Sequence, residues 1–431
     1  MKARITAGLS SFQFMAMARR GLFYTFLSLY LRVDLGLSVT ETTLLASLTM
    51  IANSLSQAFV WGKISDKYQA RAILVVVGET IAAFGYIVVY FVHVRLFNTV
   101  GSSAAAYSII AGLSLLEFFW SMSNLGWSAL ISDLSTSRER GQLMSIIYSV
   151  GGVGRIIGIS VSGLLYNYEG EGGGFRNGVL FFFASGIMLA SAAVIWLGTR
   201  STVEIDETRH AGAIDGNVVR HKAVRPTSYN PGNFYWFLTS IFIVGLGIYS
   251  ILQILILYVA LDSPIGANSL GISMIRNSAS IASIITSLLA GHFADRVGRK
   301  KALGLGLSLA VVTPLLYVFA QNPLQMIMVN SLTGISTALI NVVGYLLASD
   351  IIPADQRGRL FGQYNAATHI SFGIAGTAIG GPIADYLISS GATQATAYVA
   401  TFQVASAISV IGTITFMSKV KSSVCTQNSV D

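Results

Sequence analysis

Long stretches without a charged residue constrain this chain more than any other feature. Several exceed the roughly 18 residues that suggest a membrane span, namely residues 42–62, 177–199, 302–349 and 386–418. A soluble domain carries roughly 25% charged residues, whereas this chain of 431 residues carries 11%. The sequence therefore predicts an all-α polytopic membrane protein.

Apolar segments and turn residues predict twelve transmembrane helices. Their approximate bounds are residues 10–33, 40–65, 71–94, 103–131, 141–167, 176–200, 234–260, 268–292, 299–320, 323–349, 358–388 and 393–418. These helices form an N-terminal six-helix half (1–200) and a C-terminal six-helix half (234–418). A cytoplasmic linker (201–233) joins the halves, and a cytoplasmic tail (419–431) follows them.

The net charge of +8 follows the predicted topology. Most Lys and Arg fall on the side that holds both termini and the linker, while Arg32, Arg95 and Arg176 lie on the other side. The positive-inside rule makes the rich side cytoplasmic. We therefore expect a protein of the plasma (inner) membrane, with the lipid bilayer and no nucleic acid as its partner. A lone cysteine, Cys425, excludes an internal disulfide, and we expect no metal and no cofactor.

Two charged patterns occur twice, between apolar stretches. The segments 62–71 and 291–300 each begin with Gly and carry an Asp four residues later, followed by a basic residue. The second pattern, Asp then Arg-Gly, occurs as Asp133 with Arg140 and as Asp350 with Arg357, at equal spacing. This recurrence indicates a duplicated hydrophobic half.

With these loops the chain resembles the major facilitator superfamily (MFS) over its whole length. The first loop departs from the family pattern at Gln69, where Gly is usual, and at Ala70, where Arg is usual. The resemblance implies two related halves, inverted three-helix repeats within each, and a central site at their interface. It implies a monomeric secondary active transporter of a small molecule. The sequence lacks metalloprotease, nucleophile-elbow and Walker motifs, so we expect no enzyme.

The repeated loops could act as a gate. A carboxylate beside a helix N-terminus gains roughly 0.3–1 kcal/mol, and in this fold Asp66 and Asp295 should meet helix starts in the other half. Such contacts would favour the outward-open state. Alternatively, these charges only anchor loops at the lipid headgroups. The gating candidates are Asp66, Arg71, Asp133, Arg140, Asp295, Arg296, Arg299, Asp350 and Arg357.

Charged residues also occur inside the predicted spans, where a central charge costs about 2.5–3.5 kcal/mol on insertion scales and is usually functional or paired. They are Arg19, Arg20, Glu79, Glu117, Arg155 and Arg276. Glu117 and Arg155 both lie about 21 Å from the cytoplasmic helix ends, at 1.5 Å per residue, so they could pair. Arg20 shares a polar stripe with Tyr24, and because the resemblance implies that the first helix lines the cavity, Arg20 is assigned to it. Arg19 is then expected to satisfy Glu79.

The arginines outnumber the glutamates, and a guanidinium fork suits a carboxylate or phosphate. The sequence therefore predicts a small organic anion held by Arg20, Arg155 and Arg276. Alternatively, Arg276 faces a watery vestibule. Substrate that competes for Arg155 would favour protonation of Glu117, which makes Glu117 the main proton-coupling candidate and Glu79 the second. A permanent structural pair is the rival interpretation. The further substrate-binding candidates are Tyr24, Glu117, Asn124, Tyr249, Gln253, Asn341 and His369.

The main functional prediction is a proton-coupled carrier, symporter or antiporter, of a small organic anion. The alternative is a proton-driven exporter of hydrophobic or cationic compounds, a multidrug-type antiporter. Gly154 and Gly158, with Gly163, resemble the glycine motif of proton-coupled exporters, although Ile159 replaces the usual proline. Close helix packing is the more general explanation of the same glycines. An anion carrier needs the spare arginines in its cavity, whereas a cation exporter needs an exposed Glu117 or Glu79.

Overall fold

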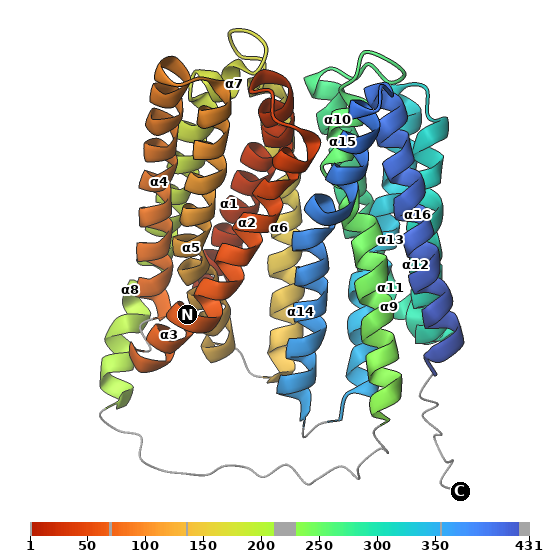
Figure 1. Cartoon of the computed structure of the whole chain (residues 1–431). Coiled ribbons are helices and arrows are strands. Elements are labelled where there is room, and N and C mark those ends of the chain that lie inside the picture. The colour runs from red at the N-terminus through yellow and green to blue at the C-terminus, as the bar shows by residue number, and fades with distance from the viewer. Residues whose placement is uncertain (1, 69–70, 135–136, 211–229, 354–355, 422–431) are drawn as a thin grey trace, which may run out of the picture. The chain divides into compact units, whose positions relative to one another are not determined.

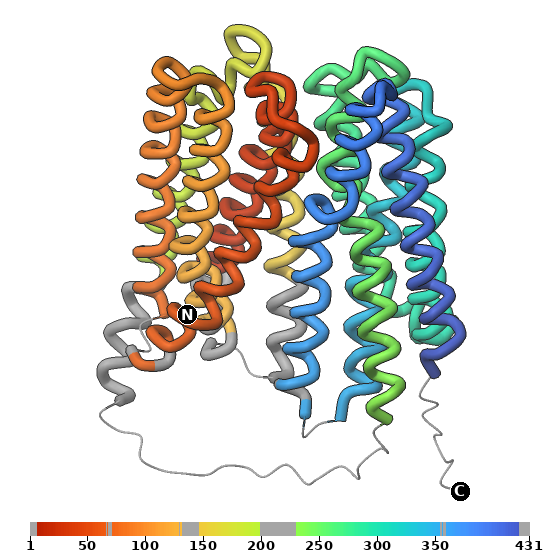
Figure 2. The backbone as a smooth tube through the Cα atoms, in the orientation of Figure 1, coloured from red at the N-terminus to blue at the C-terminus, as the bar shows by residue number. Residues whose placement is uncertain are grey.

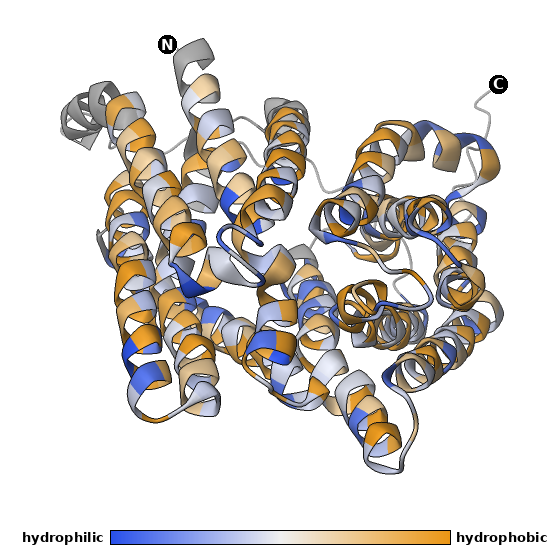
Figure 3. Cartoon of the chain, turned by 90° about the horizontal axis from the view of Figure 1, so that it is seen from above, coloured by the Kyte–Doolittle hydropathy of each residue, from blue (hydrophilic) through white to orange (hydrophobic). Residues whose placement is uncertain are grey.

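The computed structural model describes residues 2–68, 71–134, 137–210, 230–353 and 356–421, and every regular element in those ranges is a helix (Figure 1). Ten of these helices are long and apolar enough to cross a membrane. Two further helical segments complete the expected set of twelve: residues 2–34, which include Arg19 and Arg20, and residues 357–389. Figure 3 shows apolar residues over most of the helices and hydrophilic residues in many of the connections.

The described N-terminal part of the chain forms six rods and one short helix. Their elements are α1 (Lys2–Leu29) with η1 (Tyr30–Asp34), α2 (Val39–Ser56) with η2 (Gln57–Trp61) and α3 (Gly62–Tyr68), α4 (Arg71–Thr99), α5 (Ser102–Leu134), α6 (Ser137–Leu165), α7 (Gly173–Arg176) and α8 (Val179–His210). Here η marks a π-helix. Within this set α1 packs on α6 and α8, and α4 packs on α5 and α8.

The C-terminal part begins at a capped helix start, where Asn230 accepts a hydrogen bond from the backbone N–H of Asn233 and Pro231 takes the first helical position. Its elements are α9 (Pro231–Ser250), α10 (Ile254–Val259), α11 (Ser269–Val297), α12 (Arg299–Phe319), α13 (Pro323–Ile351), α14 (Arg357–Ala375), η4 (Gly376–Gly380), α15 (Gly381–Ser389) and α16 (Gln394–Lys419). Figure 2 shows η4 as a widened turn within the blue rod.

The chain separates into two compact units. Unit 1 comprises Met1–Arg220 and Ala267–Asn277, and unit 2 comprises His221–Gly266 and Ser278–Asp431. The first turns of α11 therefore belong with unit 1. Unit 2 has its own apolar core, in which α9 packs on α14 and α16, and α12 packs on α13 and α16.

Several predicted helix boundaries differ from the structure; for example, α1 begins at Lys2 rather than near residue 10. The sixth span was expected to end near residue 200, but α8 continues to His210. Loss of hydropathy marks where a helix leaves the bilayer and not where it ends. The residues after 200 include Glu204, Glu207 and Arg209, which favour helix. The polar linker thus begins as a continuation of the sixth helix.

Candidate functional site

The crossing of α1 and α6 places two arginines side by side. A Cβ added at Gly21 would overlap the backbone carbonyl of Arg155, and one at Gly158 would overlap that of Ala18. Only glycine at these positions lets the two backbones touch. Because Arg20 adjoins Gly21, this contact brings Arg20 next to Arg155. The glycines that resembled an exporter motif therefore have a packing role here.

A third arginine approaches through the first turns of α11. Ser273 Oγ donates to the carbonyl of Ile159 at 2.9 Å, and Asn277 Nδ2 donates to Ser160 Oγ at 2.9 Å. These bonds hold α11 against α6 within unit 1. Arg276 and Arg20 then lie close enough to act electrostatically on Arg155, whose side chain reaches the surface of the described structure. We refer to Arg20, Arg155 and Arg276 as the arginine cluster.

Trp120 on α5 joins the arginine doublet to Glu79. The guanidinium carbon of Arg20 lies 4.4 Å from the Trp120 ring centroid, and that of Arg19 lies 5.2 Å from it. The indole Nε1 donates to Glu79 Oε1 at 2.8 Å. Cations over a desolvated aromatic ring gain up to about 2 kcal/mol. Trp120 therefore fixes both arginine side chains of helix α1.

Glu79 is completely enclosed, with 1% of its surface exposed. It accepts hydrogen bonds from Trp120, from Ser123 Oγ at 2.7 Å and from Ser191 Oγ at 2.9 Å. Arg19, also buried, donates to the hydroxyl of Tyr86 at 2.5 Å instead. Arg19 and Glu79 thus interact electrostatically across Trp120 and not through the direct contact that the sequence predicted.

Glu117 has a different environment from the one predicted. Its Oε1 accepts a hydrogen bond from Tyr24 at 3.1 Å, and its Oε2 accepts one from Asn53 Nδ2 at 3.0 Å. Gln57 Nε2 donates in turn to Asn53 Oδ1 at 2.7 Å. The predicted Glu117–Arg155 pair is absent among the described contacts, and the charged side chains that act on Arg155 are Arg276 and Arg20. Both hydrogen-bond partners of Glu117 are neutral side chains. The π-helix η2 begins at Gln57, the residue that donates to Asn53.

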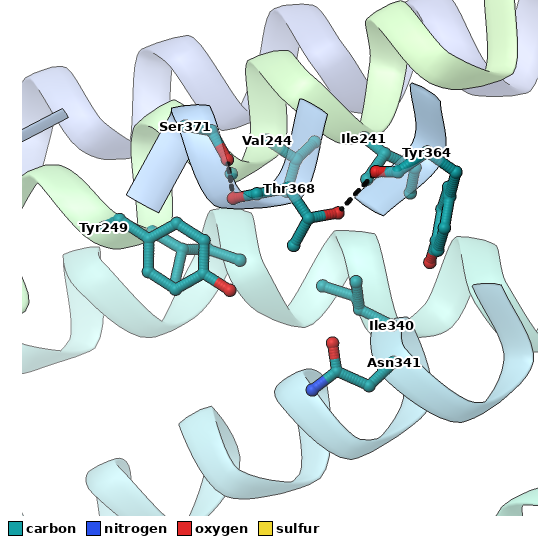
Figure 4. A pocket seen from close by; sticks show the side chains of 10 residues that line it. Ile241, Val244, Tyr249, Ile340, Asn341, Tyr364, Thr368 and Ser371 are labelled. Atoms are coloured by element: carbon teal, nitrogen blue, oxygen red, sulfur yellow. Dashed lines mark hydrogen bonds between the residues drawn. The ribbon is translucent and has the colours of Figure 1, made fainter. Parts of the chain in front are cut away.

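Unit 2 contains a small pocket between α9, α13 and α14 (Figure 4). Two predicted residues, Tyr249 and Asn341, line it together with Tyr364, Thr368 and Ser371. The last three were missed. Their spacing of four and three residues on α14 marks one helix face and could have identified them.

The other predicted polar residues are scattered. Asn124 is half-buried on α5, and His369 is exposed on α14. Gln253 lies in the break between α9 and α10, and its Oε1 is buried without a partner among the described residues. None of these three residues lines the pocket of unit 2. Within the described ranges no group of three or more His, Cys, Asp or Glu could hold a metal.

In unit 2, the second copies of the two charged patterns contact each other. Arg299 donates to Asp350 Oδ1 at 2.5 Å and lies 3.7 Å from Asp295 Oδ1, while Arg296 is exposed. Arg299 therefore ties the start of α12 to the end of α13. In unit 1, Arg71 donates to Ser65 Oγ at 3.0 Å. The side chains of four gating candidates lie outside the described ones: Asp66, Asp133, Arg140 and Arg357.

Comparison with known proteins identifies the family. The model of the Major Facilitator Superfamily matches residues 9–275 and 258–423, which together span most of the chain. The chain belongs to the major facilitator superfamily. It is therefore an integral membrane transporter and not an enzyme, as the repeated loops indicated.

Two relatives of this MFS chain match along most of its length. It is 22% identical to the "Multi-drug resistance efflux pump PmrA homolog" of Lactococcus lactis subsp. lactis over 84% of each chain. It is 24% identical to the "Multidrug resistance protein MdtG" of Yersinia enterocolitica, over 86% of this chain and 84% of the relative.

A solved structure of the nucleoside transporter NupG superposes with a TM-score of 0.69 at 16% identity. The match covers 97% of this chain and 99% of that one. At this identity the likeness supports the MFS fold and nothing finer.

Proposed function

We propose that this MFS transporter is a proton-driven exporter of hydrophobic organic compounds, the alternative raised by the sequence. The observation that carries the proposal is its similarity to two proteins named for multidrug resistance, which extends over 84% and 86% of the chain. Both matches include the two six-helix halves, so the similarity is not limited to one shared motif.

The arginine cluster narrows the class of compound. Three guanidinium groups near one another repel a cation and favour a compound with a carboxylate, sulfonate or phosphate group. The side chain of Arg155 reaches the surface of the described structure, so such a group can contact it. Glu79 and Glu117 are 1% and 5% exposed, so neither matches the exposed acid that export of cations requires. We therefore expect hydrophobic anions to be preferred over hydrophobic cations.

Glu117 is the proposed proton site. Its hydrogen-bond partners Tyr24 and Asn53 are neutral and can accept as well as donate. A protonated Glu117 can therefore keep both contacts after Asn53 or Tyr24 reorients. Glu79 has three donors and serves as a structural link between α4, α5 and α8.

Topology and gating complete the proposal. We place both termini on the cytoplasmic side of the plasma membrane, following the distribution of Lys and Arg. The contact of Arg299 with Asp295 and Asp350 is proposed to hold the cytoplasmic loops of unit 2 in one arrangement during alternating access. The transporter is expected to work as a monomer.

A second candidate function is proton-coupled carriage of a small hydrophilic organic anion. The arginine cluster is the observation that favours it, because a small anion could be bound by guanidinium groups without an apolar surface. The two candidates differ in the size of the substrate and in the direction of the proton gradient that drives its uptake into vesicles.

Transport by purified protein in proteoliposomes separates them. An antiporter accumulates substrate when the vesicle interior is acidic, and a symporter does so when the exterior is acidic. We expect an acidic interior to drive uptake of 2-naphthalenesulfonate more strongly than uptake of the cation ethidium. Arg155→Gln should reduce sulfonate uptake about tenfold, because it removes one charged contact with the sulfonate. The matched control is Arg95→Gln, since Arg95 is exposed. Uptake of succinate alone, driven by an acidic exterior, would overturn the export proposal and favour the second candidate.

A further inference from the structure

Two chains of hydrogen bonds end at the carboxylate of Glu117, one at each oxygen. The first begins at the buried Arg19, whose Nη1 donates to the hydroxyl of Tyr86. The hydroxyl of Tyr86 is hydrogen-bonded to that of Tyr24, and Tyr24 donates to Glu117 Oε1 at 3.1 Å. In the second chain, Asn53 Nδ2 donates to Glu117 Oε2 at 3.0 Å.

The direction of the first chain is fixed at its start. A guanidinium group cannot accept a hydrogen bond, so Tyr86 accepts from Arg19, and its single proton is available for Tyr24. If Tyr24 turned to accept from Glu117, its own proton would face Tyr86, and the proton of Tyr86 would lose its partner. Tyr86 is fully buried, where an unpaired donor is unfavourable. These three residues are also the titratable groups that act electrostatically on Glu117.

The second chain comes from α2 and can reverse. Behind Asn53, Gln57 Nε2 donates to Asn53 Oδ1 at 2.7 Å. A side-chain amide carries donors on one atom and an acceptor on the other, so a half-turn of its terminal group exchanges the two. Gln57 is only half-buried, so the far end of this chain is not enclosed as Tyr86 is. Turned together, the two amides let Asn53 accept from Glu117 and donate to Gln57.

We propose that the coupling proton binds to Oε2 of Glu117 and not to Oε1. Oε2 gains an O–H bond, the hydrogen bond from Asn53 Nδ2 breaks, and the new O–H donates to Asn53 Oδ1. Asn53 Nδ2 then donates to the side-chain oxygen of Gln57, while Glu117 Oε1 keeps its hydrogen bond from Tyr24. Asn53 is therefore a positioning residue for proton coupling. The inference rests on the proposed function in taking Glu117 as the proton site.

The two chains give helices α1 and α2 different roles. Protonation of Glu117 at Oε2 leaves its contact with α1 unchanged and alters its contacts with α2. Gln57 is the first residue of the π-helix η2, which continues α2. π-Helical turns are frequent at functional sites. The proton thus acts on the second helix, at the point where the regular α-helical hydrogen bonding of its backbone ends.

Infrared difference spectroscopy on the purified full-length protein in detergent identifies the protonated oxygen. With asparagine labelled at its side-chain carbonyl, acidification should produce a carboxyl band from Glu117 and a shift of one asparagine band. The shift is expected because Asn53 Oδ1 exchanges its Gln57 donor for the acid proton. Glu117→Gln should lose both signals, whereas Asn53→Leu should lose only the asparagine shift. Asn98→Leu, an exposed amide near the end of α4, is the matched control and should keep both.

Gln57→Leu provides a second variant, in case Asn53→Leu does not fold. Without Gln57, Asn53 Oδ1 has no donor from this chain until Glu117 is protonated, so the asparagine shift should become larger. Labelled tyrosine tests the rival oxygen, because a proton on Oε1 would change the hydroxyl contacts of Tyr24. A tyrosine shift that Tyr24→Phe abolishes, without an asparagine shift, would overturn the inference and leave Glu117 as the proton site.

Transport separates the inference from the proposed function. Asn53→Leu should lose gradient-driven uptake of 2-naphthalenesulfonate, whereas exchange of labelled for unlabelled substrate continues, and full gradient-driven uptake would contradict the role of Asn53. An asparagine shift in a wild type that shows no gradient-driven uptake would support the proton on Oε2 while contradicting export. A carboxyl band that persists in Glu117→Gln would overturn both proposals.

Discussion

At the scale of single residues, the two buried glutamates of unit 1 show how the same side chain takes different roles. Glu79 accepts three hydrogen bonds, one of them from the indole N–H of Trp120, so its position is fixed. Glu117 receives two neutral donors from α1 and α2. Its contacts can rearrange when the two helices move. This difference supports assigning the proton to Glu117 and a structural role to Glu79.

Replacing Glu117 by Gln should uncouple transport from protons. The amide keeps hydrogen bonds to Tyr24 and Asn53 but cannot bind and release a proton. We expect gradient-driven uptake to be lost, whereas exchange of labelled for unlabelled substrate continues. Glu79→Gln is the comparison, and it should lower the midpoint of thermal unfolding. Full gradient-driven uptake by Glu117→Gln would refute the assignment.

Asp34 provides a prediction about pH, outside the predicted spans. Tyr166 donates to its Oδ2 at 3.1 Å, and Arg176 lies 3.3 Å from its Oδ1. Burial nevertheless raises the pKa of Asp34 above its ordinary 3.8, because desolvation outweighs these two contacts. The folded state therefore favours the protonated carboxyl. The resulting contribution to stability is complete below the unfolded pKa and is lost as the pH rises through the folded pKa.

Asp34→Asn should remove this dependence, because Asn is neutral at every pH. Relative to wild type, the midpoint of thermal unfolding of the variant should rise between pH 4 and pH 7. Scans in detergent at several pH values measure the difference, with the exposed Asp262→Asn as the control. A relative stability that falls over this interval would show that the ion pair with Arg176 dominates instead.

At the scale of helices, irregular segments accompany the polar residues. The π-helix η2 begins at Gln57, next to the Asn53 that contacts Glu117. In unit 2, η4 ends at Gly380, where a Cβ would overlap the carbonyl of Ser250 at the end of α9. π-Helical turns are frequent at functional sites. The broken α9–α10 rod and η4 therefore meet where the backbones are closest.

The glycines of the α1–α6 crossing carry a prediction of their own. Gly158→Leu would drive a side chain into the carbonyl of Ala18, and such overpacking typically costs about 1–3 kcal/mol. We expect a lower thermal midpoint and weaker binding of 2-naphthalenesulfonate, because the same crossing positions Arg20 and Arg155. Gly186→Leu on α8, where no atom lies within 4 Å of an added Cβ, should behave as wild type. Equal stability of both variants would contradict a close-packed crossing.

At the scale of helices, some features could be predicted from the sequence and others could not. Length and hydropathy identify spans because the bilayer imposes the same requirement on each helix. Side-chain pairing depends on rotation about the helix axis and on crossing geometry. Glu117 and Arg155 have equal predicted depth, yet Glu117 faces Asn53 whereas Arg155 faces other arginines. The polar stripe predicted on the first helix did indicate which arginine is buried. Arg20, which belongs to the stripe, is partly exposed, whereas Arg19 is enclosed.

At the scale of the whole molecule, the repeated loops explain why the family could be predicted from the sequence. Charges between membrane spans stay at fixed positions in the chain, so their spacing survives while the apolar residues between them vary. No comparable repeated pattern in the sequence indicates the substrate. Substrate choice is proposed to depend on a few side chains, such as Arg20, Arg155 and Arg276, which lie far apart in the sequence. The family is therefore established, whereas the substrate class is a proposal.

The topology of the whole chain can be tested through its single cysteine. If both termini are cytoplasmic, a membrane-impermeant maleimide should label Cys425 in inside-out vesicles but not in intact cells. The matched control is Cys425→Ser combined with Glu171→Cys, which moves the thiol to the connection between α6 and α8. That variant should be labelled in intact cells. Because the positive-inside rule assigns Cys425 and Glu171 to opposite sides, labelling of both on the same side would refute the proposed topology.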